Sequence, residues 1–171
     1  NPILGKYMEE AVGVNRHEYI NSGVLVMNLK KMRQKKFSQN FMRLLNTYHF
    51  DNVAPDQDYF NAMCNGNIKY IDKCWDSMPG GEKIQNPKLI HYNLFHKPWH
   101  YDDVLYQEHF WQYAKKSPFY NDILIEKNNY SEEEKAFDAK CMQDLMERAI
   151  KVPENEVTFK KVYEKGEKIR I

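Results

Sequence analysis

The sequence of 171 residues has little of what marks several classes of protein. It has only 7 glycines and 7 prolines, too few for a disordered or collagen-like chain. No apolar run approaches the ~18 residues of a membrane helix, and the opening NPILGKY does not form a secretory leader. The 3 cysteines are odd in number and lack metal-type spacing, which favours reduced thiols inside the cell. We therefore expect a cytoplasmic protein, either free or peripheral to a membrane surface, with no transmembrane segment.

The sequence also lacks an excess of charge of either sign, because its formal net charge is only +1. This balance gives no electrostatic reason to expect nucleic acid as a partner. The basic run KKMRQKK at 30–36 is the local exception, and no aromatic residues alternate with its charges as base stacking would require. We interpret it as a solvated connection between two elements, with a basic patch that binds nucleic acid or anionic lipid as the alternative.

The hydrophobic pattern predicts an α/β fold, because strand-like and helix-like segments alternate along the chain. The run Gly23–Met27 is continuous and apolar, as in a buried strand. Two further strands are predicted at 68–78 and 88–92. Helices are predicted from about Ser38, from Pro55, before Pro118, and from a capping box of Ser131 and Glu134 to Val152-Pro153.

The stretch KLIHYNLFHKPWHYDD at 88–103 holds three histidines and a lysine. An imidazole at the end of a strand suits a metal ion, and Lys97 suits phosphate oxygens. A zinc site of His91, His96 and His100 is an alternative, although no glutamate occupies the position of an HExxH motif. A crowded aromatic loop without a ligand is the third reading.

The sequence DQD at 56–58 raises a similar choice. Paired carboxylates can hold a divalent cation, but Pro55 precedes them and a helix-like segment follows. Asp56 therefore either caps the helix or, with Gln57, presents hydrogen-bonding groups to a polyhydroxylated ligand.

Three segments in the same order resemble motifs of glycosyltransferase family 8. They are YINSGVLVMNLKKMR at 19–33, PDQDYFN at 55–61 and IHYNLFHKPW at 90–99. The resemblance spans roughly residues 1–120. Met32 stands where an aromatic residue is common, and Leu94 stands where the family has a glycine that lets the backbone approach the diphosphate.

The resemblance implies a retaining hexosyltransferase with a GT-A fold, a mixed sheet flanked by helices. Such an enzyme uses a nucleotide-sugar donor, here UDP-glucose or UDP-galactose, with Mn2+ or Mg2+, and a glycan, lipid or protein acceptor. Residues 1–125 would form the C-terminal part of the catalytic domain, and 126–171 a charged helical extension.

The resemblance also implies roles for single residues. His91 matches the metal ligand, and Lys97 matches the lysine that contacts the diphosphate. Asp56 and Gln57 match catalytic residues, and Asp58 is expected to be structural. The residues expected to bind the donor sugar are Asn21, Ser22, Asp56 and Gln57. We expect all these groups to converge on one pocket.

The family's Asp-x-Asp and nucleotide-binding strands lie upstream of the Asn-Ser-Gly motif, outside these 171 residues. We therefore expect this chain alone to be inactive, and to self-associate, to pair with the missing N-terminal half of the domain, or to be marginally stable. The alternative function is a non-catalytic fragment that binds a carbohydrate or a protein partner.

Overall fold

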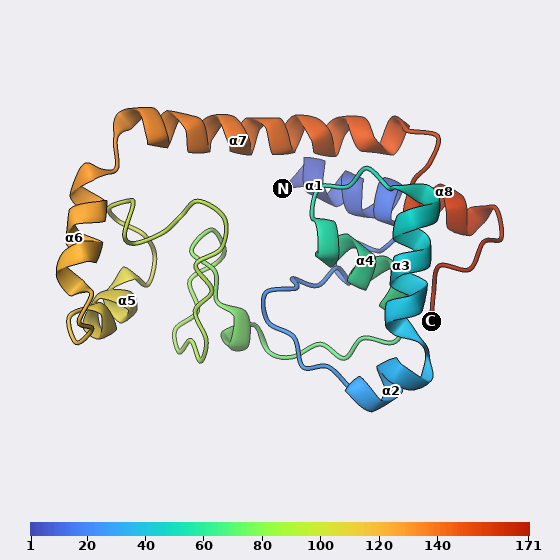
Figure 1. The fold of residues 1–171 in the computed structure, drawn as a ribbon, viewed down its shortest axis with the longest axis horizontal. Helices are drawn as coiled ribbons and strands as arrows, with labels where there is room; N and C mark the ends of the chain where they lie inside the picture. The colour runs from blue at the N-terminus through green and yellow to red at the C-terminus, as the bar shows by residue number, and fades with distance from the viewer. The chain divides into compact units, whose positions relative to one another are not determined.

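The computed structural model describes residues 1–171 and is built from helices joined by extended segments and turns (Figure 1). Three short helices of other types accompany the α-helices: the π-helix η1 (Met8–Val12) and the 3-10 helices η2 (Lys73–Asp76) and η3 (Val152–Glu154). The α-helices are α1 (Pro2–Tyr7), α2 (Leu29–Gln34), α3 (Phe37–Tyr48), α4 (Pro55–Cys64), α5 (Gln107–Ala114), α6 (Tyr120–Asn129), α7 (Glu132–Lys151) and α8 (Phe159–Glu164).

The expected mixed sheet is wrong, because the structure contains no sheet. The only strand-type pairing is an isolated parallel bridge between Ser77 and Ile90. The apolar run Gly23–Met27 has no neighbouring strand, and the Val26 side chain is 93% exposed. A strand needs a second strand for its hydrogen bonds, and none lies beside this run. The strands predicted at 68–78 and 88–92 are likewise absent, apart from the single bridge.

The predicted helices are confirmed, and two of them begin as expected. Helix α4 covers Pro55–Cys64, the predicted segment. At the start of α7 the Ser131 hydroxyl accepts from the Glu134 N–H at 3.2 Å, while the Glu134 carboxylate accepts from the Ser131 N–H at 2.7 Å. This reciprocal pair is the predicted capping box. None of the helices combines the length and apolar composition that crossing a membrane requires.

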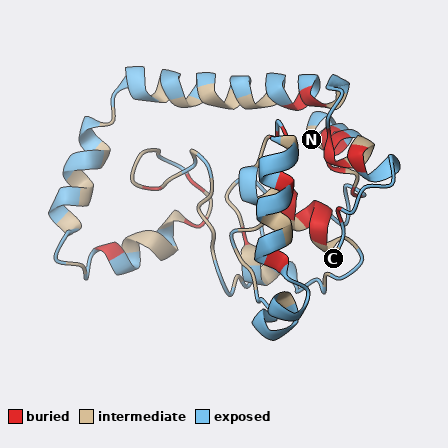
Figure 2. Ribbon diagram, turned by 45° about the vertical axis from the view of Figure 1, so that its right-hand side comes forward, coloured by how far each residue is buried: buried red, intermediate tan, exposed pale blue.

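The chain divides into two compact units, each described here by itself. Unit 1 comprises Asn1–Tyr70 and Met142–Ile171, and unit 2 comprises Ile71–Cys141. The main hydrophobic core belongs to unit 1, where Figure 2 shows buried residues in several helices. Its fully buried members include Leu44 of α3 and Met63 of α4.

The last thirty residues complete the core of unit 1. The Phe159 ring of α8 stacks on Phe50, with centroids 3.9 Å apart, and meets Tyr59 edge-on at 4.8 Å. The backbone N–H of Ile171 donates to the Met63 carbonyl at 3.0 Å. A boundary between catalytic domain and extension at residue 125 stays a prediction.

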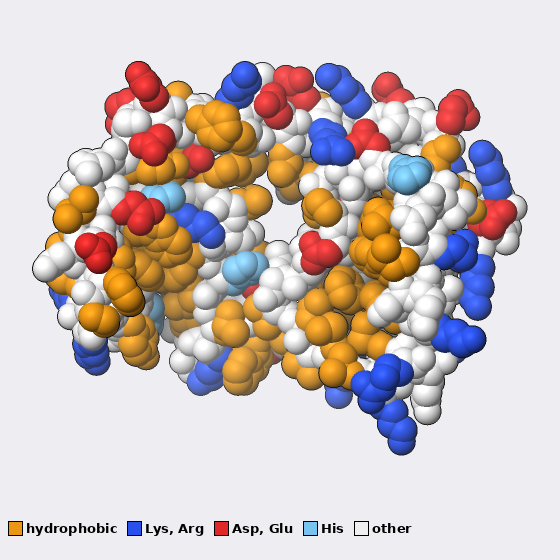
Figure 3. All heavy atoms as spheres, in the orientation of Figure 1, with side chains coloured by type: hydrophobic (Ala, Val, Ile, Leu, Met, Phe, Trp, Pro, Cys, Tyr) orange, Lys and Arg blue, Asp and Glu red, His pale blue; other side chains and the backbone are white.

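Unit 2 is held together by hydroxyl and aromatic contacts. Tyr101 and Tyr130 both donate to the Asp138 carboxylate, at 2.7 and 2.6 Å. The Tyr92 hydroxyl donates to the Tyr106 carbonyl at 2.6 Å. Hydrophobic side chains also reach the surface, as the space-filling view shows (Figure 3).

Candidate functional site

Helix α4 places the three residues of the DQD motif in different environments. Ala54 is the N-cap and Pro55 the first helical residue, so Asp56 does not cap the helix. The Asp56 side chain is exposed, Gln57 is half-buried and Asp58 is fully buried. The helical turn therefore separates a carboxylate available to a ligand from one committed to the interior.

Asp58 is a structural residue, as expected. Its carboxylate accepts hydrogen bonds from the Tyr7 hydroxyl at 2.6 Å, the Tyr19 hydroxyl at 2.5 Å and the Ala54 N–H at 2.9 Å. Burial raises the pKa of Asp58, although these donors act in the opposite direction. Burial next to Asp58 also raises the pKa of both tyrosines. The network joins α1 and the segment before Ile20 to the start of α4.

The same helix binds the Asn-Ser-Gly segment through two side-chain amides. The buried Asn61 amide accepts from the Ile20 N–H at 2.8 Å and donates to the Ile20 carbonyl at 2.9 Å. One turn earlier, the Gln57 Oε1 accepts from the Ser22 N–H at 2.9 Å, and its Nε2 donates to the Tyr19 hydroxyl at 3.1 Å. Because residues four apart lie on one helix face, the two amides hold a single extended segment.

The four residues predicted to bind the donor sugar thus come from two neighbouring segments of unit 1. The Asn21 side chain accepts from the Gly23 N–H at 2.7 Å, which orders the turn after Ser22. Each primary amide has two N–H donors, and the Gln57 contacts use only one of them. This part of the molecule offers amide and carboxylate groups suited to hydroxyls.

His91 and Lys97 lie in unit 2, and their convergence with the unit 1 residues stays a prediction. The His91 Nδ1 lies 3.1 Å from the Asp76 Oδ1, and both side chains are partly buried. The Lys97 ammonium donates to the Tyr92 carbonyl and lies 5.7 Å from the centroid of the Trp99 ring. Partial desolvation lowers the pKa of Lys97.

The loop between these two residues turns at Leu94, where φ is +47°. This left-handed conformation is the one that glycine adopts without strain. Leu94 therefore follows a backbone course open to the family's glycine, while its side chain is 52% exposed.

The residues of this chain do not form a complete metal site. No three side chains of the metal-binding types Cys, His, Asp and Glu lie close enough together to hold an ion. The zinc alternative of His91, His96 and His100 is therefore wrong for this chain. His91 can offer one imidazole ligand, because its Nε2 makes no hydrogen bond.

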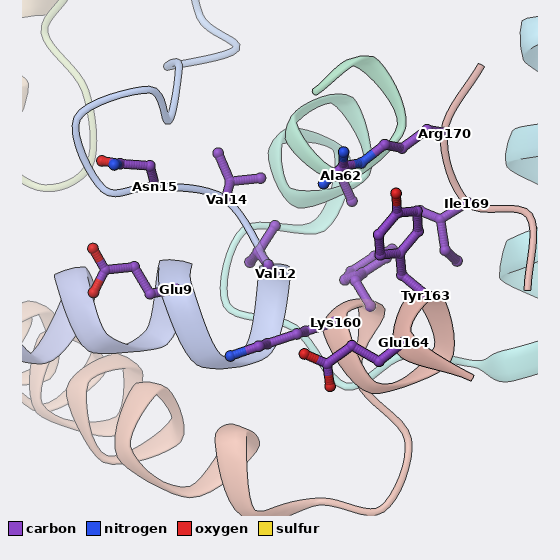
Figure 4. A pocket seen from close by; sticks show the side chains of 12 residues that line it. Glu9, Val12, Val14, Asn15, Ala62, Lys160, Tyr163, Glu164, Ile169 and Arg170 are labelled. Carbon is purple, nitrogen blue, oxygen red and sulfur yellow. The ribbon is translucent and has the colours of Figure 1, made fainter. Parts of the chain in front are cut away.

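A cavity of about 280 Å³ in unit 1 lies apart from these residues (Figure 4). None of the predicted site residues lines it. Its apolar lining includes Val12 and Phe159, and charged side chains such as Lys160 and Arg170 lie around it. The Arg170 guanidinium lies 4.3 Å from the centroid of the Tyr163 ring, so this cation already has an aromatic partner.

Sequence reasoning missed Asn61 and Asp76. Asn61 follows Gln57 by four positions on a predicted helix, so helical periodicity could have indicated that they share a face. Asp76 precedes His91 by fifteen positions, and no local pattern relates the two.

Comparison with known proteins identifies the family. The family model described as glycosyl transferase family 8 matches residues 6–103. A Haemophilus influenzae protein named as a glycosyltransferase is 26% identical over 108 residues, covering 57% of this chain and 33% of the relative. The lipopolysaccharide 1,2-glucosyltransferase of Escherichia coli K12 is 30% identical over 99 residues, covering 48% and 29%.

The chain spans about a third of the length of the curated relatives it matches. No solved structure matches it. The family match covers more than half of the chain and includes the Asn-Ser-Gly segment, the start of α4 and the loop that carries His91 and Lys97. This chain belongs to glycosyl transferase family 8.

Proposed function

We propose that this protein is part of a retaining hexosyltransferase that transfers glucose from UDP-glucose to a saccharide acceptor. Family membership supports sugar transfer, and the name of the Escherichia coli relative favours glucose and a glycan acceptor. UDP-galactose is the other donor to test.

The observation that carries this proposal is the hydrogen bond from the Ser22 N–H to the Gln57 Oε1 at 2.9 Å. It unites two family motifs that are 35 residues apart in sequence. A donor sugar presents several hydroxyls and develops positive charge as its anomeric bond breaks. The exposed carboxylate of Asp56, with the amides of Gln57 and Asn21, can orient these hydroxyls and stabilise that charge.

The leaving diphosphate needs groups that stabilise negative charge. The Lys97 ammonium can supply one, exchanging its contact with the Tyr92 carbonyl for phosphate oxygens. His91 would hold a divalent cation together with ligands from outside this chain. When bound, Mn2+ or Mg2+ supplies Lewis-acid stabilisation of the diphosphate.

The test is cleavage of UDP-glucose by the full-length protein, measured as release of UDP. Water takes the glucosyl group in place of the acceptor, so the acceptor need not be known. Replacing Gln57 by Ala should lower turnover about 100- to 1000-fold, the usual effect of losing one transition-state donor. The matched control is Gln39→Ala, an exposed glutamine on α3.

A second pair of variants tests the diphosphate side. His91→Ala should abolish Mn2+-dependent release of UDP, whereas His96→Ala, an exposed imidazole in the same loop, should leave it unchanged. Unchanged turnover in the His91 variant would refute the assignment. Neither residue belongs to the hydrophobic core, so circular dichroism spectra should match those of the parent protein.

A further inference from the structure

The contact between His91 and Asp76 has the chemistry of a positioning pair. The Nδ1–Oδ1 distance is 3.1 Å, and the side chains are only 28% and 19% exposed. An ionised carboxylate can only accept a hydrogen bond, so Nδ1 is the donor and carries the proton. In the neutral ring this leaves a lone pair on Nε2.

The backbone fixes this pair before any ligand binds. The Ser77 N–H donates to the Leu89 carbonyl at 3.0 Å, and the His91 N–H donates to the Ser77 carbonyl at 3.0 Å. Asp76 ends η2, whose Cys74 carbonyl accepts from the Leu89 N–H at 3.1 Å. The main chain thus places the carboxylate beside the imidazole independently of their mutual attraction.

We propose that Asp76 is a positioning residue that holds His91 as the Nδ1–H tautomer and presents its Nε2 lone pair to the divalent cation. This inference rests on the proposed function for the identity of the cation. Metal-binding histidines usually donate their second ring N–H to a carboxylate or carbonyl, which fixes the ring and raises its basicity as a ligand. Asp76 supplies that acceptor.

His100 in the same unit makes the opposite arrangement. Its Nε2 lies 2.9 Å from the Glu126 carboxylate, and its ring stacks on Tyr130 with centroids 3.9 Å apart. The carboxylate therefore selects the Nε2–H tautomer, and stacking covers one ring face. Of these two histidines, only His91 keeps Nε2 available to a ligand.

This contrast provides an internal control for an NMR experiment on the 171-residue chain. Long-range 1H–15N spectra distinguish the two imidazole tautomers when recorded about two pH units above the ordinary histidine pKa of ~6.5. We expect His91 to show the Nδ1–H pattern and His100 the Nε2–H pattern. Asp76→Ala should convert His91 to a mixture of tautomers and leave His100 unchanged. Asp76→Asn, whose Oδ1 can still accept, should restore the Nδ1–H form.

Titration of the full-length protein with Mn2+ alone tests the metal role separately, because His91 is the one ligand that these 171 residues offer. Paramagnetic broadening should affect the His91 ring before that of His100, and Asp76→Ala should require about 10- to 100-fold more Mn2+ for equal broadening. An Nε2–H pattern in the parent protein, or an unchanged tautomer in Asp76→Ala, would overturn the positioning role. If the tautomers are as expected but Mn2+ broadens both rings equally, the positioning role stands and the assignment of the cation to His91 is overturned. Loss of sugar transfer alone would decide neither, because it is a readout of the proposed function.

Discussion

The Ser22 N–H donates to the Gln57 Oε1 at 2.9 Å, and this bond attaches the Asn-Ser-Gly segment to the first turn of α4. The neighbouring bonds from Asn61 to the backbone of Ile20 extend the attachment by one helical turn. The geometry of the proposed sugar-binding residues therefore depends on two amide side chains.

Removing either amide should release a different backbone N–H. Gln57→Ala should speed hydrogen exchange at Ser22 about fivefold, and Asn61→Ala should do so at Ile20, because each N–H loses a bond worth about 1 kcal/mol. Exchange measured by NMR at single residues checks this. Gln39→Ala should change neither rate. If exchange at the Ser22 and Ile20 N–H groups were equally faster in both variants, the segment would detach as a whole.

Removing each of the two carboxylates of the DQD motif should change the free energy of unfolding by a different amount. Asp58→Ala removes a buried acceptor from the Tyr7 and Tyr19 hydroxyls and should lower the free energy of unfolding by about 3 kcal/mol. Asp56→Ala changes an exposed side chain and should stay within about 0.5 kcal/mol. Urea unfolding followed by circular dichroism provides the comparison. Similar losses in both variants would contradict the division into structural and ligand-facing roles.

Leu94→Gly should stabilise the protein. The left-handed conformation costs a non-glycine residue about 1–2 kcal/mol, and the greater flexibility of glycine when unfolded offsets about half of this. We expect a gain of about 0.5–1 kcal/mol in urea unfolding. Leu89→Gly is the matched control, since Leu89 is 39% exposed and has no positive φ, and it should destabilise. Destabilisation by both variants would mean that the Leu94 side chain contributes more than its backbone costs.

The pair of Glu9 and Arg16 should make stability depend on pH in acid. Two hydrogen bonds from the guanidinium, at 2.9 and 2.6 Å, lower the pKa of Glu9 from 4.5 to about 2. Since the folded pKa is depressed, the stabilisation is present above pH 4.5 and is lost as the pH falls towards 2. Denaturant midpoints measured across this range should fall less steeply in Glu9→Gln than in the parent protein. Arg16→Gln should behave like Glu9→Gln, and a retained slope in either variant would exclude this pair as the cause.

Helices were predictable because the bonds that form them are local. Pro55 marks the first position of α4, and Ser131 with Glu134 forms a cap from residues three apart. The strand predictions failed for the converse reason. The run around Val26 has the composition of a buried strand, but composition does not specify a partner for its backbone.

Only those residues of the candidate site that belong to a family motif could be predicted from the sequence. The motifs identified Gln57 and Ser22, and the structure shows that they are bonded to each other. They did not identify Asp76, because a carboxylate fifteen positions from its imidazole becomes a neighbour only through folding.

The discontinuity of unit 1 has a consequence for biosynthesis. Phe159 and Ile171 fill the core begun by residues such as Phe50 and Met63, and all of unit 2 is translated between these two sets. On the ribosome, residues 71–141 can emerge and fold while the first seventy still lack their final packing partners. Nascent chains stalled before residue 142 should therefore bind chaperones through an unfinished apolar surface, and release should follow only when α8 leaves the exit tunnel.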